Sequence, residues 1–220
     1  MPSSTVEDYL KCILVAQQRE PETLVTMGEI AAALAVVPGT VTAMVKTLAD
    51  SGLVSYEPYS GVRLTDSGRQ LAAHVLRRHR LIELFLVQVM GMDWTEVHPE
   101  AELLEHAVSD RLIARMDEML GYPSVDPHGD PIPDVHGVVD ESVLPSLLVC
   151  DLGVPLKVAR LTDQSRDFLQ LSDRRGLRPG RPVQVESREE AADTVVLHAL
   201  ASGERLSLGF RAASKILVEV

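Results

Sequence analysis

Prolines and glycines accumulate between Gly121 and Pro145 of this 220-residue chain, and the stretch separates two parts with different apolar periodicity. Before it, apolar residues recur at intervals of three and four, which predicts amphipathic helices. After it, short β-like runs alternate with glycine and proline turns, which predicts a small β-barrel. These runs are 156–158, 182–185, 194–197 and 215–218. We therefore expect a mainly α-helical chain with a small β domain, joined by a linker.

The N-terminal part predicts a helix-turn-helix motif. A first amphipathic helix covers residues 6–19, and Thr26 with Glu29 three residues later forms a capping box at the start of a second, short helix. Pro38 begins a third helix, which ends before Gly52. Two helices joined by so short a turn are typical of DNA-reading proteins, although two merely packed helices would give the same bare pattern.

A β-hairpin wing is expected directly after the third helix, since two short runs, 53–57 and 62–65, flank a proline and glycine turn. The wing favours the DNA-binding interpretation over two packed helices. Small and polar side chains on the third helix fit the major groove, and wing residues would touch the DNA backbone. The expected DNA contacts are Pro38, Gly39, Thr40, Thr42, Ala43, Lys46, Tyr59 and Arg63.

The charge of the chain opposes simple electrostatic attraction to DNA. Its net charge is −11, and the first 70 residues hold five basic and eight acidic side chains. Phosphate contacts normally come from a surplus of Lys and Arg. DNA affinity would therefore depend on few local cations, on helix N-termini and on bound metal that neutralises acidic clusters.

Histidines and carboxylates recur at helical spacing in the middle of the chain, on helices predicted over 65–90 and 99–120 and, for one histidine, just before the second helix. They are His79, Glu83, His98, Glu102, Glu105 and His106. Imidazole and carboxylate donors without a thiolate favour Mn²⁺, Fe²⁺ or a related ion over a closed structural zinc site. Each residue alone could be a solvated charge on a helix face, but the same helices are strongly apolar. The set therefore predicts a metal site.

The N-terminal sequence and the two cysteines indicate the cellular compartment in which we expect the protein. The chain shows neither a leader pattern nor an apolar run long enough to span a membrane, so we expect a cytoplasmic protein with no membrane partner. Cys12 and Cys150 lie far apart in apolar surroundings, which predicts free thiols rather than a disulfide.

Several segments in order resemble the diphtheria-toxin-repressor family of metal-activated transcriptional repressors, and the resemblance extends over nearly the whole chain. They are 6–11, 64–68, 78–83, 97–98, 102–110 and 127–133. The family implies a winged-helix DNA-binding domain at 1–73, a helical metal-binding and dimerisation domain at 74–140, and an SH3-like domain at 141–220.

The resemblance also implies two metal positions per subunit. The primary position would use Asp8, Glu102, Glu105 and His106. The ancillary position would use His79, Glu83 and His98, completed from the C-terminal domain by Asp163, Gln164 or Asp167.

Residues at two of these positions indicate which metal is sensed. Iron-sensing members of the family carry methionine where Asp8 stands and cysteine where Glu102 stands, whereas both are carboxylates here, as in the manganese-responsive branch. Lys11 stands near a position where some short manganese regulators have a glutamate ligand, which favours isolated ions over a two-ion cluster. We expect Mn²⁺ as the activating ion, with Fe²⁺, Co²⁺, Zn²⁺ or Cd²⁺ able to bind in vitro.

The function expected from these residues is a Mn²⁺-dependent repressor of manganese-uptake genes. It would bind a palindromic operator on double-stranded DNA as a homodimer, joined through the apolar faces of 81–89 and 103–116. An Fe²⁺-dependent repressor of the same fold is the near alternative. A metal-dependent enzyme is the distant one, because no HExxH motif, nucleophile elbow or phosphate-binding glycine loop accompanies the ligands.

Overall fold

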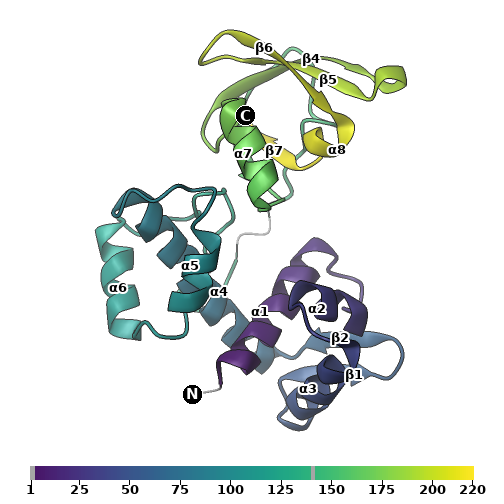
Figure 1. The fold of residues 1–220 in the computed structure, drawn as a ribbon, viewed down its shortest axis with the longest axis vertical. Coiled ribbons are helices and arrows are strands. Elements are labelled where there is room, and N and C mark those ends of the chain that lie inside the picture. Colours follow the sequence, from purple (N-terminus) through teal and green to yellow (C-terminus); the bar gives the residue numbers. More distant parts are fainter. Residues whose placement is uncertain (1–2, 140–141) are drawn as a thin grey trace. The chain divides into compact units, whose positions relative to one another are not determined.

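The computed structural model describes residues 3–139 and 142–220, which form two compact units. The first unit contains the described parts of Met1–His79, Leu103–Ile113 and Ile132–Glu141. The second contains Arg80–Glu102, Ala114–Pro131 and Ser142–Val220. Figure 1 shows the helices and strands of both.

The first unit is built around a helix-turn-helix. It consists of α1 (Ser4–Arg19), α2 (Met27–Ala33) and α3 (Pro38–Asp50). The predicted capping box is present: the backbone N–H of Glu29 donates to Thr26 Oγ1 at 3.2 Å, and Thr26 N–H donates to Glu29 Oε2 at 2.7 Å. Pro38 occupies the first turn of α3, where its missing N–H has no helical partner to lose. The helix-turn-helix prediction is therefore confirmed.

A two-stranded antiparallel wing follows α3. Strand β1 (Val54–Glu57) pairs with β2 (Gly61–Leu64), in the register Val54 with Leu64. Tyr59 lies fully exposed in the turn between them, with a φ of 68°. A hydrogen bond connects the wing to α1: the backbone N–H of Leu64 donates to the side-chain oxygen of Gln17 at 3.2 Å. Buried apolar side chains of these elements form one core with the start of α4 (Asp66–Gln88).

The helix predicted over 99–120 is divided into two. The structure has α5 (His98–Leu104) and α6 (Asp110–Met119), joined by a turn. Ser109 explains the division, because its hydroxyl accepts from Leu112 N at 3.4 Å as an N-cap of α6 does. Glu105 and His106 consequently lie in the turn rather than on a helix face.

The described part of the predicted linker contains two turns of the same sequence pattern, Asp-x-His-Gly. In the first, Asp126 Oδ1 accepts from the N–H groups of His128 and Asp130 at 2.8 and 2.9 Å. In the second, Asp134 makes the equivalent bonds to residues 136 and 138, both at 2.8 Å. The glycines, Gly129 and Gly137, have φ of 86° and 81°. These turns order the chain where glycine and proline content alone indicates only a linker.

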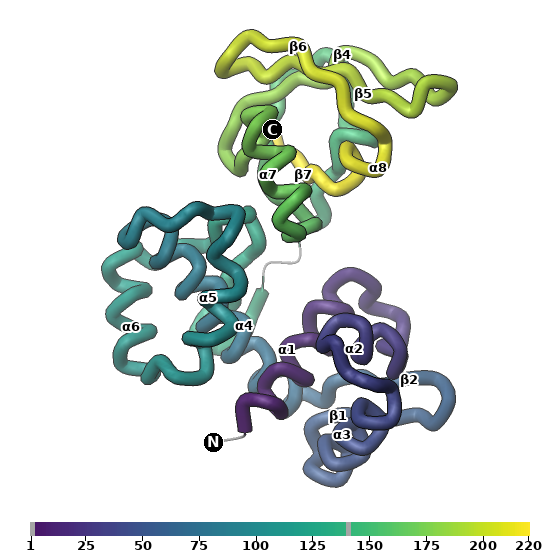
Figure 2. The backbone as a smooth tube through the Cα atoms, viewed as in Figure 1, coloured from purple at the N-terminus to yellow at the C-terminus, as the bar shows by residue number. Residues whose placement is uncertain are grey.

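The C-terminal part forms a five-stranded antiparallel sheet in the order β6-β5-β4-β3-β7. Figure 2 shows how its strands curve around one interior, bordered by α7 and α8. Its elements are β3 (Pro155–Leu161), α7 (Arg166–Arg174), β4 (Pro182–Glu189), a short 3-10 helix (Glu190–Ala192), β5 (Thr194–Ala199), β6 (Glu204–Gly209), α8 (Phe210–Ala213) and β7 (Ile216–Glu219). The predicted small β-barrel is confirmed, whereas α7 and β6 were not foreseen.

Trp94 joins the core of this sheet from the loop after α4. Its side chain is buried, its indole N–H donates to Asp173 at 3.2 Å, and the guanidinium of Arg178 stacks 5.1 Å from its ring. The second unit therefore combines part of the helical segment with the β domain. Among the described residues no single helix is long and apolar enough to span a membrane; α2 and α3 pass on length and composition only as a pair, and they are bent by 109°.

Candidate metal centres

Asp8, Glu105 and His106 form the first candidate centre, which we call the Asp8 cluster. Their donor atoms lie within 4.8 Å of one another. His106 Nε2 is 2.8 Å from Asp8 Oδ1 and 3.3 Å from Glu105 Oε1. Helix α1 supplies Asp8, and the turn after α5 supplies the other two. Two carboxylates and one imidazole converging in this way are suited to an oxygen-preferring divalent cation.

Glu105 is the most deeply buried member of the cluster, and cationic groups approach both of its oxygens. Lys11 Nζ lies 2.6 Å from Oε1, and His79 Nδ1 donates to Oε2 at 2.5 Å. Burial acts to raise the pKa of Glu105, but the hydrogen bond from His79 and the charges of His79 and Lys11 outweigh it and lower the pKa. The carboxylate is therefore charged at neutral pH.

Glu7 supports His106 from the other side of the imidazole ring. Its Oε2 lies 2.6 Å from His106 Nδ1, while Nε2 faces Asp8. Burial acts to lower the pKa of His106, but the hydrogen bond to Glu7 and the charges of Glu105 and Asp8 outweigh it and raise the pKa. A cation would bind the deprotonated Nε2, with Glu7 accepting from Nδ1–H, an arrangement common behind metal-bound histidines.

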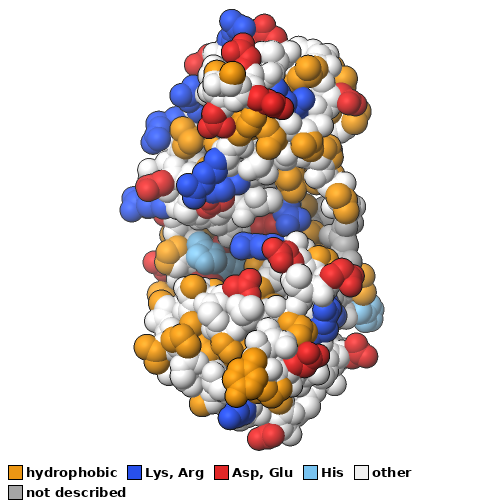
Figure 3. Space-filling model, turned by 90° about the vertical axis from the view of Figure 1, so that its right-hand side faces the viewer, with side chains coloured by type: hydrophobic (Ala, Val, Ile, Leu, Met, Phe, Trp, Pro, Cys, Tyr) orange, Lys and Arg blue, Asp and Glu red, His pale blue; other side chains and the backbone are white. Residues whose placement is uncertain are grey.

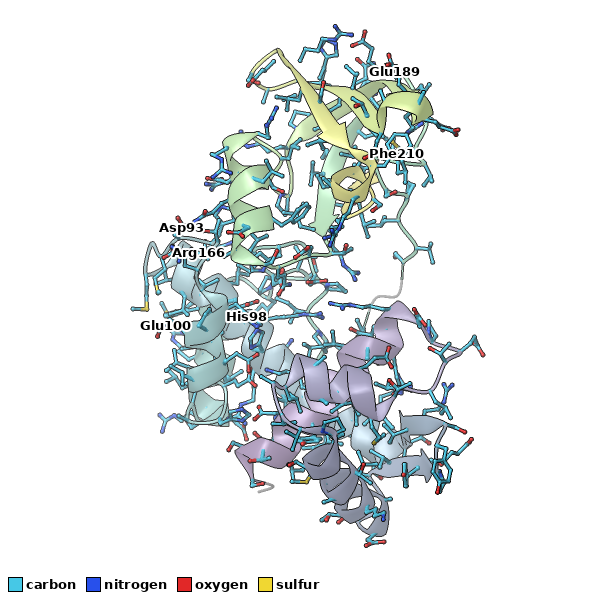
Figure 4. The ribbon with its side chains drawn as sticks, turned by 45° about the vertical axis from the view of Figure 1, so that its right-hand side comes forward. Asp93, His98, Glu100, Arg166, Glu189 and Phe210 are labelled. Atoms are coloured by element: carbon cyan, nitrogen blue, oxygen red, sulfur yellow. The ribbon has the colours of Figure 1, made fainter. Side chains whose placement is uncertain are left out.

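Glu83, Asp126 and His128 form a second candidate centre, the Glu83 cluster, in the second unit. All three are buried, and their donor atoms lie within 4.8 Å of one another. His128 Nδ1 is 3.8 Å from Glu83 Oε2 and 4.0 Å from Asp126 Oδ1. His98 lies beside it, with Nδ1 3.1 Å from Glu83 Oε1. Figure 4 labels His98 at the start of α5.

The unsatisfied buried atoms of the Glu83 cluster are compatible with a bound cation. The Nε2 of His128 lies 2.9 Å from the carbonyl oxygen of Trp94, which can only accept, so Nε2 carries a proton and Nδ1 is the nitrogen that could offer a lone pair to a cation. Within the described residues, neither this buried nitrogen nor Asp126 Oδ2 has a hydrogen-bond partner. Burial and the charges of Asp130 and Glu83 raise the pKa of Asp126, which Arg80 only partly offsets. A divalent cation would satisfy both atoms and offset the repulsion.

Basic side chains border the Glu83 cluster on the Asp130 side. Arg80 Nε lies 3.8 Å from Asp126 Oδ2, and its Nη1 donates to the carbonyl oxygen of Pro131 at 2.5 Å. Asp130 forms an ion pair with Arg160, whose Nε lies 2.7 Å from Oδ1, and its Oδ2 accepts from the Gln164 amide at 2.6 Å. These contacts hold the turn that carries His128 against strand β3.

The other sequence-predicted ligands are placed as follows. His79 lies in the first unit, and Glu83, His98 and Glu102 lie in the second. Glu102 Oε1 is 3.5 Å from His98 Nε2. Asp163 accepts from Lys215 and from Ser165 N, and Gln164 is bonded to Asp130. Asp167 is exposed on α7, near Arg166, which is labelled in Figure 4.

Four residues of these centres were missed from the sequence: Glu7, Asp126, His128 and Asp130. Glu7 lies in the segment 6–11 that resembles the family, but no role was predicted for it. The Asp126 turn lay in a predicted linker, although its Asp-x-His-Gly pattern was a usable signal. An acid and a histidine two residues apart, followed by glycine, predict a tight turn with both side chains held close together.

The predicted DNA contacts lie mostly on one face of α3. Val41, Val45 and Leu48 bury the opposite face, which leaves Thr40 and Lys46 exposed to solvent. Pro38, Gly39 and Ala43 are also exposed, and Thr42 is half-buried. Arg63 instead donates to the carbonyl oxygens of Pro21 and Glu22 at 2.8 and 3.0 Å. Figure 3 shows acidic and basic side chains interspersed over the visible face.

A winged helix carrying one ligand of a carboxylate and imidazole cluster defines a class of protein, the metal-dependent DNA-binding transcriptional repressors. Comparison with known families agrees. Residues 1–62 match the N-terminal DNA binding domain of the iron dependent repressors, 65–134 match their metal binding and dimerisation domain, and 146–220 match the FeoA domain. The chain belongs to the iron dependent repressor family, the family of the diphtheria toxin repressor. It is a dimeric, metal-dependent regulator that binds DNA, and not an enzyme.

Similar proteins of full length include both iron and manganese regulators. The iron-dependent repressor IdeR of Mycobacterium leprae is 31% identical over 227 residues, covering 98% of this chain and 96% of that protein. A solved structure of a manganese-dependent transcriptional repressor in complex with manganese is 40% identical, with a TM-score of 0.87, covering 97% of this chain and 99% of that one. The apo form of the manganese-activated repressor ScaR is 34% identical, with a TM-score of 0.79, covering 96% and 99%.

Proposed function

We propose that the protein is a Mn²⁺-activated repressor that binds a palindromic operator and represses genes of manganese uptake. The donor chemistry of the two clusters carries this proposal. Both consist of carboxylates and imidazoles without sulfur, a donor set suited to Mn²⁺. The similarity to manganese-dependent repressors supports the same metal.

Through the Asp8 cluster, a bound metal would contact α1 of the DNA-binding domain directly. Asp8 lies on α1, whose buried face packs in the core of the winged helix, while Glu105 and His106 come from a distant part of the sequence. A cation bound by all three would supply positive charge that holds α1 to this turn. The protein would have two arrangements, one that binds DNA and one that does not, and the cation favours the first only if it binds that arrangement more tightly. Coupling free energies of about 1–3 kcal/mol between two binding events, here those of metal and DNA, are typical.

The Glu83 cluster is proposed as the second metal position. Its three ligands are held by α4 and by the Asp126 turn, with His98 beside Glu83. This extends the ancillary set proposed from the sequence, in which Asp126 and His128 were absent. His79 and Glu102 remain proposed ligands, as do Asp163, Gln164 and Asp167 from the C-terminal domain.

Dimerisation is proposed through exposed apolar residues near the end of α5 and on α6. Leu103 and Leu112 are 73% and 47% exposed. Within the expected segment 81–89, Leu81, Ile82, Leu84 and Leu86 are buried in the chain itself, whereas Val89 is 48% exposed, so Val89 is the residue of that segment proposed to contact the partner. A twofold dimer would present two α3 helices to two half-sites, which accounts for a palindromic operator.

Calorimetry with cluster variants tests the metal assignment. We expect Mn²⁺ to bind two classes of site in the wild type, with His106→Ala removing one and His128→Ala the other. Under anaerobic conditions Fe²⁺, Co²⁺ and Zn²⁺ serve as competitors. Operator DNA selected from random duplexes in the presence of Mn²⁺ should contain an inverted repeat. A Mn²⁺ isotherm that neither substitution alters would contradict the assignment.

A further inference from the structure

Lys11 brings a positive charge into the Asp8 cluster. It lies on α1 one turn after Glu7, and its side chain is 11% exposed against 0% for that of Glu105. Its ammonium group lies 2.6 Å from Glu105 Oε1. A lysine whose charged end points inward, away from water, needs a specific partner, and Glu105 is that partner.

The oxygen that Lys11 contacts is also the one that faces the other donors of the cluster. Glu105 Oε1 is 3.3 Å from His106 Nε2, which in turn is 2.8 Å from Asp8 Oδ1. The second oxygen, Oε2, faces His79 at 2.5 Å. A cation among Asp8, Glu105 and His106 would therefore bind the oxygen to which Lys11 already donates.

We propose that Lys11 is a tethered counter-ion of Glu105, which neutralises this carboxylate in the metal-free protein and raises the metal concentration needed for binding. The inference rests on the proposed function of the Asp8 cluster. A divalent cation must displace the ammonium from Oε1 or bind close to it, and either step opposes binding. The same ion pair stabilises the metal-free fold, because without Lys11 the buried Glu105 carboxylate would keep, among the described residues, only the histidines His79 and His106 as partners.

Lys11→Met tests this, because methionine retains most of the apolar stem and removes the charge. Thermal unfolding without metal should show a Tm lower by about 5 °C or more, the size of effect expected when a buried ion pair loses one partner in a chain of this length. Mn²⁺ should raise the Tm of the variant more than that of the wild type. Calorimetry should show Mn²⁺ affinity at this site increased about tenfold or more. His128→Ala can serve as the background, which leaves the Asp8 cluster as the measured site.

Two further variants serve as controls. Arg19→Met removes an exposed charge from the end of the same helix and should change neither the metal-free Tm nor the Mn²⁺ affinity. Lys11→Met combined with Glu105→Gln also removes the carboxylate charge that Lys11 balanced, so the metal-free Tm should recover part of its loss while Mn²⁺ binding falls. The metal-free Tm of the double variant is measured without metal, so its result does not depend on the proposed function.

Three results would overturn the inference. One is a Tm loss in Lys11→Met that is equal with and without Mn²⁺, and another is a Mn²⁺ affinity that falls or stays unchanged. The third is a double variant with a metal-free Tm no higher than that of Lys11→Met. Failure of wild-type protein to bind Mn²⁺ would instead contradict the proposed function, and with it the inference.

Discussion

Glu7 Oε2 lies 2.6 Å from His106 Nδ1, so one turn of α1 holds this imidazole from one side while Asp8 faces its Nε2 from the other. Adjacent residues of one helix thus contact both nitrogens of a histidine ninety-eight or more residues away in sequence. If a cation replaces the proton on Nε2, Glu7 would still accept a hydrogen bond from Nδ1–H, so we expect Nε2 to be the donor atom for the cation.

Replacing Glu7 with alanine should weaken Mn²⁺ binding at the Asp8 cluster by about 10–100-fold, the usual effect of losing the partner behind a metal-bound histidine. Glu7→Gln keeps an acceptor oxygen and should retain most of the affinity. Calorimetry measures the affinities, and ¹⁵N NMR of labelled histidine reports the tautomer of His106 in neutral form. An Nε2–H tautomer in the wild type would contradict this role of Glu7.

Gly129 fixes the turn that carries His128. Its φ is 86°, and a Cβ there would lie 1.9 Å from the carbonyl oxygen of Ala159, a backbone atom that cannot move away alone. Gly129→Ala should therefore cost about 3 kcal/mol or more of unfolding free energy and abolish Mn²⁺ binding at the Glu83 cluster. Urea unfolding and calorimetry measure these effects.

Gly121→Ala is the matched control, because Gly121 has a similar φ of 75° but nothing within 4 Å of its Cβ position. We expect it to cost about 1 kcal/mol, from backbone strain alone, and to leave metal binding intact. Equal losses in the two variants would mean that the close approach to Ala159 is unimportant.

The Asp163 contacts predict a pH dependence of stability. Burial acts to raise the pKa of Asp163, but hydrogen bonds with Lys215 and Ser165 outweigh it and lower the pKa to about 2. A lowered folded-state pKa stabilises the protein above the unfolded-state pKa, which is about 3.9, and this stabilisation is lost as the pH falls toward 2. Asp163→Asn should therefore be less stable than the wild type at pH 7, and the difference should shrink between pH 4 and pH 2. Denaturant unfolding at several pH values checks this, and a constant difference would exclude it.

Much of the fold was predictable from the sequence because the signals are local. The capping box at Thr26, the proline at the start of α3 and the glycine turn of the wing each depend on a few neighbouring residues. The division between α5 and α6 was also encoded locally, by Ser109, but the apolar periodicity continues through it. The apolar periodicity therefore predicted one continuous helix, and the N-cap at Ser109 was recognised only in the structure.

The candidate site was less predictable, since its contacts are long-range. No local pattern places Lys11 against Glu105, or Glu83 against His128. The spacing of Glu102, Glu105 and His106 indicated one helix face, whereas the turn after α5 directs Glu105 and His106 to different partners on α1. The Asp126 turn was missed because proline and glycine content was taken to indicate a linker.

Asp8→Met tests whether the hard donor on α1 sets metal preference. A thioether is a soft, neutral ligand, so Mn²⁺ should lose more affinity at the Asp8 cluster than Fe²⁺ or Co²⁺ does. Competition calorimetry under anaerobic conditions gives the ranking, with Asp8→Asn as a variant that keeps an oxygen donor and removes the charge. If Asp8→Met leaves the order of the metals unchanged, Asp8 does not contribute to selectivity.

Operator binding as a function of buffered free Mn²⁺ tests the central claim most directly. Fluorescence anisotropy with a selected palindromic duplex should show tight binding by the Mn²⁺-loaded wild type and binding weaker by about 5- to 150-fold after chelation, the range that couplings of about 1–3 kcal/mol produce. His106→Ala should abolish the response to Mn²⁺. Equal operator affinity of the metal-free and Mn²⁺-loaded protein would contradict metal activation, even though the fold and the DNA-binding domain would stand.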